Sequence, residues 1–216
     1  MMTSVYRDMF ALCATVLLYF ISVSHSAPLS CEDLLRPLDQ LEPGPMEGRW
    51  TLVASSLNHL PSLESLKRVD SITIDISVSV SNSNETSSYT YTQITRFGNK
   101  CEYFPFNISI EGSTLTFNVR DNANFTGTFL HTSCPDCVVM RLEIEELRIN
   151  KSLDLYLFSR RREVGPKEME EYKAQLECLE LPPPVVMDPT KELCPEQTPS
   201  EPAAAPTGEK TEEQTA

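Results

Sequence analysis

Hydrophobic and polar residues alternate through the central part of the chain, between Gly48 and Arg160. The clearest case is DSITIDISVSV (70–80), in which Ile or Val occupies every second position from Ile72 and Thr, Asp or Ser stands between them. A period of two is typical of a β-strand that buries one face. Seven further segments have strand-like composition: GRWTLVASS (48–56), TSSYTYTQITRF (86–97), CEYFPFNISI (101–110), STLTFNV (113–119), ANFTGTFLHT (123–132), CVVMRLEIE (137–145) and KSLDLYLFSR (151–160). The pattern predicts an all-β fold of eight antiparallel strands, as an up-and-down barrel or a sandwich.

Two segments depart from this alternation. SLNHLPSLESLKRV (56–69) is a long connection between the first two predicted strands, with room for a helical turn. GPKEMEEYKAQLECLEL (165–181) begins with Pro166, which suits a first helical position, and has glutamates in its first turn. Its apolar residues recur at helical spacing and form one stripe: Met169, Tyr172, Leu176 and Leu179. We therefore expect one C-terminal α-helix, packed outside the strands.

The two ends of the chain differ from this central part. Residues 1–26 contain Arg7, then an apolar run at 9–23, then small residues before a cut expected after Ser26. This order is typical of a secretory signal, and the run is shorter than the roughly 20 residues that span a bilayer. Residues 198–216 are rich in proline and acidic residues and indicate a disordered tail. We expect residues 27–197 to form one secreted domain without stable membrane insertion.

The cysteines fit an exported protein. Seven are present, and removal of the signal would take away Cys13. The remaining six are Cys31, Cys101, Cys134, Cys137, Cys178 and Cys194. An even number in an exported chain indicates disulfides, although six cysteines allow 15 pairings and spacing alone does not choose among them.

The net charge and the sequons are also typical of an exported protein. The formal net charge is −13, which argues against nucleic acid and against anionic membrane surfaces as partners. Four Asn-x-Ser/Thr sequons predict N-glycosylation on outward-facing positions: Asn84, Asn107, Asn124 and Asn150. We expect a soluble, monomeric glycoprotein of the extracellular space.

Enzymatic chemistry finds little support in the sequence. Cys134-Pro-Asp-Cys137 could be a redox CxxC or half of a metal site, but its position between two strands favours a structural disulfide. A zinc site would need further ligands, and His59 and His131 lie far apart in the sequence. A nucleophile motif GxSxG and a phosphate-binding loop are both absent. We therefore expect no catalytic residues, no metal and no cofactor.

Three features of the sequence resemble the lipocalin family. Gly48-x-Trp50 opens the first strand, YLFSR (156–160) ends the last strand with Arg160, and the helix that follows contains a cysteine. The resemblance covers roughly residues 41–181 and implies a closed eight-stranded barrel. It also implies that Trp50 lies at the closed end, with Arg160 buried across its face and the next two arginines solvated. The family's Thr-Asp-Tyr motif is only faintly represented, by Cys-Pro-Asp136-Cys.

Within the lipocalins, the chain is similar to alpha-1-acid glycoprotein and apolipoprotein M, and to fish plasma proteins that bind saxitoxin, tetrodotoxin or tributyltin. That likeness implies a secreted plasma carrier of a small hydrophobic or amphipathic ligand, with a toxin or xenobiotic as a candidate. It also implies the disulfides Cys31–Cys178, Cys101–Cys194 and Cys134–Cys137. The alternative is an acute-phase or immune-modulating glycoprotein that acts through its surface and glycans. A lipocalin enzyme would need a free barrel cysteine, which strand 70–80 lacks.

The outward direction of glycosylated asparagines predicts which side chains face the barrel interior. If Asn107 points outward, alternation sends Phe104, Phe106, Ile108 and Ile110 inward. The predicted ligand-binding residues are Phe106, Phe117, Phe125, Phe129, His131, Tyr89, Tyr91 and Tyr156. Gln93 and Arg96 are further polar candidates, although the facing of strand 86–97 is ambiguous. Core packing is the competing interpretation for each inward phenylalanine.

Overall fold

The computed structural model describes residues 29–39, 43–79, 88–117, 123–146 and 150–196. The predicted secretory signal, the predicted tail and Asn84 lie outside these ranges, as do the side chains of Asn124 and Asn150. Asn107 is exposed, on the outer face of its strand. Glycosylation at all four sequons therefore stays a prediction.

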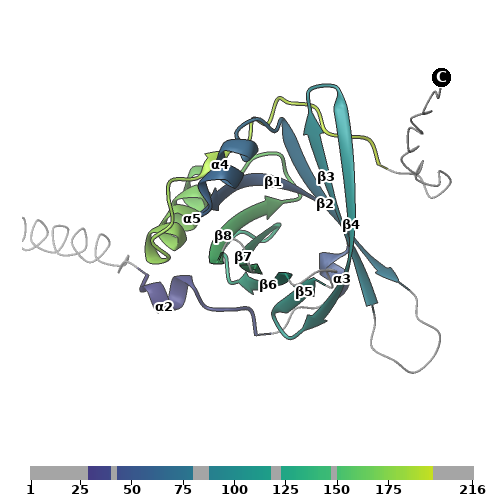
Figure 1. The fold of residues 1–216 in the computed structure, drawn as a ribbon. Coiled ribbons are helices and arrows are strands. Elements are labelled where there is room, and N and C mark those ends of the chain that lie inside the picture. Colours follow the sequence, from purple (N-terminus) through teal and green to yellow (C-terminus); the bar gives the residue numbers. More distant parts are fainter. Residues whose placement is uncertain (1–28, 40–42, 80–87, 118–122, 147–149, 197–216) are drawn as a thin grey trace, which may run out of the picture.

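Eight antiparallel strands form a closed barrel, in which each strand pairs with its neighbours in the sequence (Figure 1). Their bounds are β1 Gly48–Leu57, β2 Ser71–Ser79, β3 Ser88–Phe97, β4 Lys100–Glu111, β5 Thr114–Phe117, β6 Ala123–Leu130, β7 Cys137–Glu146 and β8 Asn150–Ser159. β1 closes the barrel because it pairs with both β8 and β2. The predicted up-and-down barrel is confirmed, and the sandwich is excluded.

β1 changes partners along its length. Its first residues, Gly48 to Thr51, pair with β2, and an irregularity in the β8 pairing follows between Leu52 and Ala54. Beyond that point a short ninth strand, β9 (Val185–Val186), pairs with Ala54 and Ser55. A bulge of this kind bends a strand and ends one of its pairings. β9 was not predicted, because the sequence PPPVV reads as the start of a proline-rich segment.

Within the described residues, four helices accompany the barrel: α2 (Cys31–Leu34), α3 (Pro43–Met46), α4 (Leu60–Leu66) and α5 (Pro166–Cys178). α4 occupies the β1–β2 connection, where the sequence left room for a helical turn. α5 is the predicted C-terminal helix, and its buried Tyr172 and Leu176 pack against a cluster that includes Val139 and Leu155 on the outer wall. Tyr172 also donates a hydrogen bond to the carbonyl of Leu155, at 2.7 Å. The short helices α2 and α3 were not predicted.

Three disulfides join the cysteines in the pairs that the family resemblance implies. Cys31–Cys178 links the N-terminal segment to α5, Cys101–Cys194 links the C-terminal segment to β4, and Cys134–Cys137 lies in the β6–β7 turn. The first two close segments of 147 and 93 residues. Each is worth about 2–4 kcal/mol through restriction of the unfolded chain.

The C-terminal strap, residues 187–196, crosses the outside of β1, β2 and β3 before it reaches Cys101. Arg96 of β3 points outward to this strap, where it donates to the Leu193 carbonyl and forms an ion pair with Glu192 at 2.7 Å. Arg96 therefore does not face the barrel interior, although the sequence made it a polar candidate there. Thr95 and Phe97, its neighbours in the sequence, face inward because alternation along a strand sends them to the opposite side.

Trp50 lies at the end of the barrel where β1 begins, and only 5% of its surface is exposed. Its indole N–H donates to the Met46 carbonyl at 2.9 Å, and the guanidinium carbon of Arg160 lies 3.8 Å from the ring centroid. Arg160 is exposed rather than buried, which corrects the sequence-based prediction, because it covers the indole from the solvent side. Gly48 has φ +86°, and a Cβ there would meet Arg160 Nη1 at 3.3 Å. The positive φ favours glycine at this position, and the missing Cβ leaves room for the Arg160 guanidinium.

Candidate functional site

A cavity of about 410 Å³ occupies the barrel interior and extends to the end where α4 lies. This volume is within the range of about 300–1,000 Å³ that small-molecule sites occupy. Most of its lining is aromatic or aliphatic: Leu52, Leu57, Leu66, Val69, Ile72, Tyr91, Phe97, Phe104, Phe106, Phe117, Phe125, Met140, Leu142, Ile144, Tyr156 and Phe158. The remaining lining residues are Ser62, Ser65, Gln93, Thr95 and Glu102. Close-packed protein interiors contain few spaces larger than a water molecule, so a cavity of this size is a candidate binding site.

Four rings from adjacent strands form one wall of the cavity. Strand register brings them together, because Tyr91 pairs with Phe106 and Phe117 pairs with Phe125. The ring of Phe117 lies at the centre, with centroids 5.0 Å from Tyr91, 5.7 Å from Phe106 and 6.4 Å from Phe125. All three contacts are edge-on, the geometry that the ring quadrupoles favour. The wall therefore presents both ring edges and ring faces to a ligand.

The hydroxyl of Tyr91 is the polar group of that wall. Only 3% of Tyr91 is exposed, and its interactions in the described part of the chain are ring contacts without a hydrogen bond. Burial raises the pKa of the phenol far above its usual value, so the group stays neutral. A neutral hydroxyl without a protein partner can donate to, or accept from, the polar part of a bound molecule.

Tyr156 and Asp154 form a second polar pair on the opposite wall. The Tyr156 hydroxyl donates to Asp154 Oδ2 at 3.2 Å, and the Asn58 backbone N–H donates to Asp154 Oδ1 at 3.2 Å. Asp154 is 3% exposed, and desolvation raises its pKa, although these hydrogen bonds and His59 oppose the rise. Asp154 was not among the site residues predicted from the sequence. Its position two residues before Tyr156, on the inward face of an otherwise apolar strand, was the available signal.

Asp154→Asn is expected to raise the free energy of unfolding near neutral pH and to have less effect near pH 4. Burial raises the folded-state pKa of Asp154 above its unfolded value, so the folded protein holds this proton more tightly. The stability that this group contributes is present at acid pH and is lost as the pH rises through the folded pKa. Asparagine carries no charge at either pH and can still accept from the Asn58 N–H. Urea unfolding of both proteins across this pH range measures the effect, and parallel pH profiles would contradict it.

The structure places five of the eight predicted ligand-binding residues on the cavity lining: Phe106, Phe117, Phe125, Tyr91 and Tyr156. Tyr89 and Phe129 are buried in the barrel core but do not line the cavity. They lie toward the closed end of β3 and β6, where side chains fill the interior. This position favours core packing, the competing interpretation, for these two residues.

His131 does not line the cavity and is exposed. The expected alternation from Phe125 through Phe129 does not reach it, because β6 ends at Leu130. Beyond that residue the chain pairs with the N-terminal segment, and the His131 backbone N–H donates to the Arg36 carbonyl at 2.8 Å. The inward assignment of His131 is wrong for this reason.

The charge around the cavity is uneven. Glu102 is the one charged residue among the described lining residues, and its carboxylate pairs with the exposed Lys100 at 2.6 Å. In the parts of the chain that the structure describes, no arginine or lysine lines the cavity. An anionic ligand would therefore lose water without gaining a cationic partner, which is costly in an apolar site.

One cluster has the composition of a metal site. Cys134, Asp136 and Cys137 bring three ligand-type atoms within 4.8 Å of one another. The two sulfur atoms are bonded to each other, so in this state they are not thiolate ligands.

The described residues include no helix long and apolar enough to cross a membrane.

Similarity to known proteins is found in the fold of the chain. No family model and no curated protein sequence matches the chain. Among solved structures, the one described as "The Siderocalin Ex-FABP functions through dual ligand specificities" superposes with a TM-score of 0.56 at 13% sequence identity. The match covers 71% of this chain and 97% of that chain. The chain therefore has the lipocalin fold, an eight-stranded up-and-down barrel with an α-helix against its outer wall.

Proposed function

We propose that this protein is a secreted, monomeric lipocalin that binds and transports a small hydrophobic or amphipathic molecule in its barrel. The observation that carries the proposal is the cavity of about 410 Å³ with its aromatic wall. Filling this space with an apolar molecule would remove both the ligand and the lining from water, at about 25 cal/mol for each Å² of apolar surface. The even set of disulfides supports an extracellular location, such as plasma.

The lining favours a ligand whose polar group is neutral or cationic. Tyr91 offers a hydroxyl that has no hydrogen-bond partner among the described residues, and the ring faces of the wall attract cations through their quadrupoles. Glu102 adds a carboxylate to the lining. Toxins or xenobiotics such as saxitoxin, tetrodotoxin or tributyltin, which the family resemblance suggested, are therefore candidate ligands.

A matched pair of amphiphiles tests this preference: dodecyltrimethylammonium and dodecanoate, which share an alkyl chain of similar length. We expect isothermal titration calorimetry to show the ammonium compound binding at least about tenfold more tightly, a difference of about 1.4 kcal/mol. Glu102→Gln is the control and should narrow the difference, because it removes the charged group from the lining. Equal or tighter binding of dodecanoate would contradict the inferred electrostatics.

The alternative function is that of an acute-phase or immune-modulating glycoprotein that acts through its surface and glycans. The exposed sequon at Asn107 is the observation that favours it. Titration with a steroid, a retinoid, a sphingolipid, tributyltin and tetrodotoxin separates the two, with tyrosine fluorescence as the signal because Tyr91 and Tyr156 line the cavity. Absence of saturable binding by every compound would count against transport and favour the alternative.

A further inference from the structure

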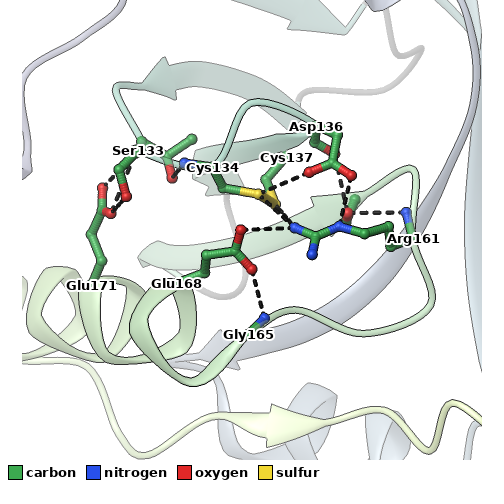
Figure 2. The surroundings of a disulfide bond; sticks show 10 residues. Ser133, Cys134, Asp136, Cys137, Arg161, Gly165, Glu168 and Glu171 are labelled. Carbon is green, nitrogen blue, oxygen red and sulfur yellow. Dashed lines mark hydrogen bonds and ion pairs between the residues drawn. A yellow bond between two sulfur atoms is a disulfide. The ribbon is translucent and has the colours of Figure 1, made fainter.

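A charged network surrounds the Cys134–Cys137 disulfide in the β6–β7 turn, where this turn meets the start of α5 (Figure 2). The network lies outside the barrel, and none of its residues lines the cavity. Its members come from the turn, from the segment after β8 and from α5. Ligand binding in the barrel therefore does not explain this cluster.

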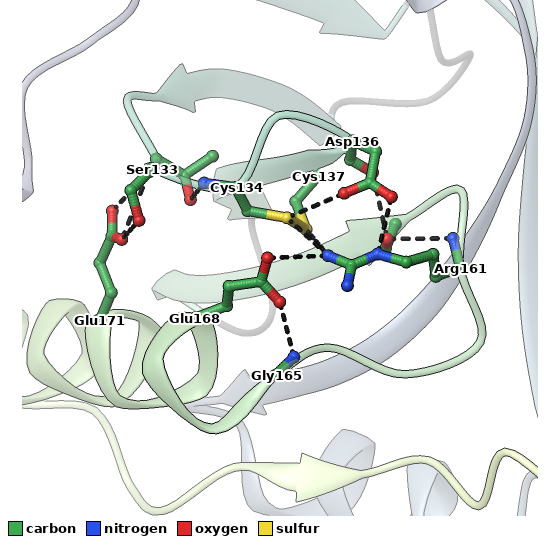
Figure 3. A network of polar contacts seen from close by, with 10 residues as sticks. Ser133, Cys134, Asp136, Cys137, Arg161, Gly165, Glu168 and Glu171 are labelled. Atoms are coloured by element: carbon green, nitrogen blue, oxygen red, sulfur yellow. Dashed lines mark hydrogen bonds and ion pairs between the residues drawn. A yellow bond between two sulfur atoms is a disulfide. The ribbon is translucent and has the colours of Figure 1, made fainter.

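Arg161 is the centre of the network (Figure 3). Its Nη2 lies 3.2 Å from Cys134 Sγ and 3.9 Å from Cys137 Sγ. The guanidinium is held by two carboxylates, with Nε 2.6 Å from Asp136 Oδ2 and Nη2 2.8 Å from Glu168 Oε1. We had expected Arg161 to be simply solvated, but these contacts fix its position against the sulfur atoms. The same contacts raise the pKa of Arg161, so the group stays cationic.

These neighbours suit a reduced cysteine pair better than a disulfide. The sulfur atoms of a disulfide carry no charge and accept hydrogen bonds weakly, so a guanidinium contributes little to them. A thiolate is stabilised by a nearby cation, and an arginine beside a cysteine lowers the pKa of its thiol. Asp136 Oδ1, 3.3 Å from Cys134 Sγ, can accept a hydrogen bond from a protonated Cys134 thiol but repels the thiolate, so Arg161 is the group that favours ionisation of Cys134.

The turn is also held by hydrogen bonds that do not involve the sulfur atoms. The Asp136 carbonyl accepts from the Arg160 N–H at 3.0 Å and from the Ser159 hydroxyl at 3.1 Å. On the other side, the Ser133 N–H donates to the Glu171 carboxylate of α5 at 2.9 Å. The two cysteines are only three positions apart, whereas the other disulfides close much longer segments. Because chain-entropy stabilisation grows with loop length, loss of this bond would cost less than loss of either other disulfide.

We propose that Cys134–Cys137 is a redox-active disulfide that oxidises dithiols, with Arg161 stabilising the Cys134 thiolate of its reduced form. This activity lies beyond ligand transport and does not depend on it. Arg161 acts as a positioning and charge-stabilising residue, since the bonds that change are between sulfur atoms. A surface hollow lined by residues 160–166, Pro189 and Thr190 opens beside its side chain, which is 43% exposed.

The reaction balances with a dithiol as reductant. One thiolate of the dithiol attacks Cys137 Sγ, breaks the disulfide and forms a mixed disulfide. Cys134 leaves as a thiolate against Arg161. The second thiol of the reductant loses its proton and attacks the mixed disulfide, which releases a cyclic disulfide and Cys137. Of the two protons from the dithiol, Cys137 takes up one and solvent takes the other.

Equilibration of the full chain with mixtures of reduced and oxidised dithiothreitol tests the proposal. After the reaction is quenched with iodoacetamide, peptide mass spectrometry measures the reduced fraction of each disulfide. We expect Cys134–Cys137 to be reduced at dithiothreitol ratios that leave Cys31–Cys178 and Cys101–Cys194 intact. Arg161→Gln should lower its equilibrium constant for reduction about tenfold, which is about 30 mV for a two-electron couple.

Arg162→Gln is the matched control, because it makes the same change of charge at the next residue, whose side chain binds the Lys191 carbonyl instead. We expect it to change the equilibrium constant less than twofold. Arg161→Lys keeps the charge and should lie between wild type and Arg161→Gln, and it carries the comparison if the glutamine variant does not fold. The proposal is overturned if Cys134–Cys137 is reduced only together with the other disulfides, or if Arg161 and Arg162 variants behave alike.

Discussion

Trp50→Ala is expected to lower the free energy of unfolding by about 3–5 kcal/mol, the range for removal of a large buried aromatic side chain. The indole is almost fully buried at the closed end of the barrel. Its loss would remove the hydrogen bond to Met46, leave Arg160 without the ring beneath it and open a void in the core. The affinity for dodecyltrimethylammonium should fall less than threefold, because Trp50 does not line the cavity.

Urea unfolding and calorimetric titration of the same preparation give the two quantities. Arg160→Ala provides a graded comparison. It removes the cation–π contact, worth about 0.5–2 kcal/mol, together with the hydrogen bonds that Arg160 donates to the carbonyls of Pro45, Glu47 and Arg49, and it keeps the buried indole. A loss of affinity in Trp50→Ala that exceeds the loss of stability would place the indole in the binding site and contradict the assignment of the closed end.

Phe117→Ala should show the opposite balance. The Phe117 ring contacts three other rings at the centre of the cavity wall, so its removal would take away part of the ligand's contact surface. We expect the affinity for dodecyltrimethylammonium to fall about tenfold to a hundredfold, or about 1.4–2.8 kcal/mol. The free energy of unfolding should fall less than in Trp50→Ala, because Phe117 is only partly buried in the absence of ligand.

Phe129→Ala is the matched control for this prediction. Phe129 is also an inward phenylalanine, but it is fully buried near the closed end and does not line the cavity. Its loss should reduce stability by about 3–5 kcal/mol and leave affinity nearly unchanged. Equal losses of affinity in Phe117→Ala and Phe129→Ala would show that ligand binding does not depend on the ring network.

The strands of this barrel could be predicted because their physical signal is local. A half-buried strand has an apolar residue at every second position, and DSITIDISVSV (70–80) shows this alternation without interruption. The helix α5 could also be predicted, because its apolar residues recur at helical spacing and must face the outer wall of the barrel. Pairing of the chain into a closed barrel was recognised from Trp50 and Arg160, whose contact joins the first strand to the end of the last.

The parts that escaped prediction depend on contacts between distant segments. β9 forms because β1 leaves β2 and exposes an edge, which nothing in PPPVV reveals. The inward face of β3 carries Tyr91 and Gln93, and both of its faces contain polar groups, so alternation alone could not orient it. The prediction that His131 faces inward fails because β6 ends before it. That end is set by pairing with the N-terminal segment, which the composition of the strand does not reveal.

Location of a bound probe tests the central claim, that a ligand occupies the barrel cavity, most directly. In protein labelled with ¹³C at methyl groups, nuclear Overhauser effects can be recorded between bound dodecyltrimethylammonium and individual residues. We expect contacts to Met140, Leu142 and Ile144, which line the cavity on β7, and none to Val186, which is exposed on the outside. Contacts to Val186 without contacts to the three cavity residues would show surface binding and contradict the account.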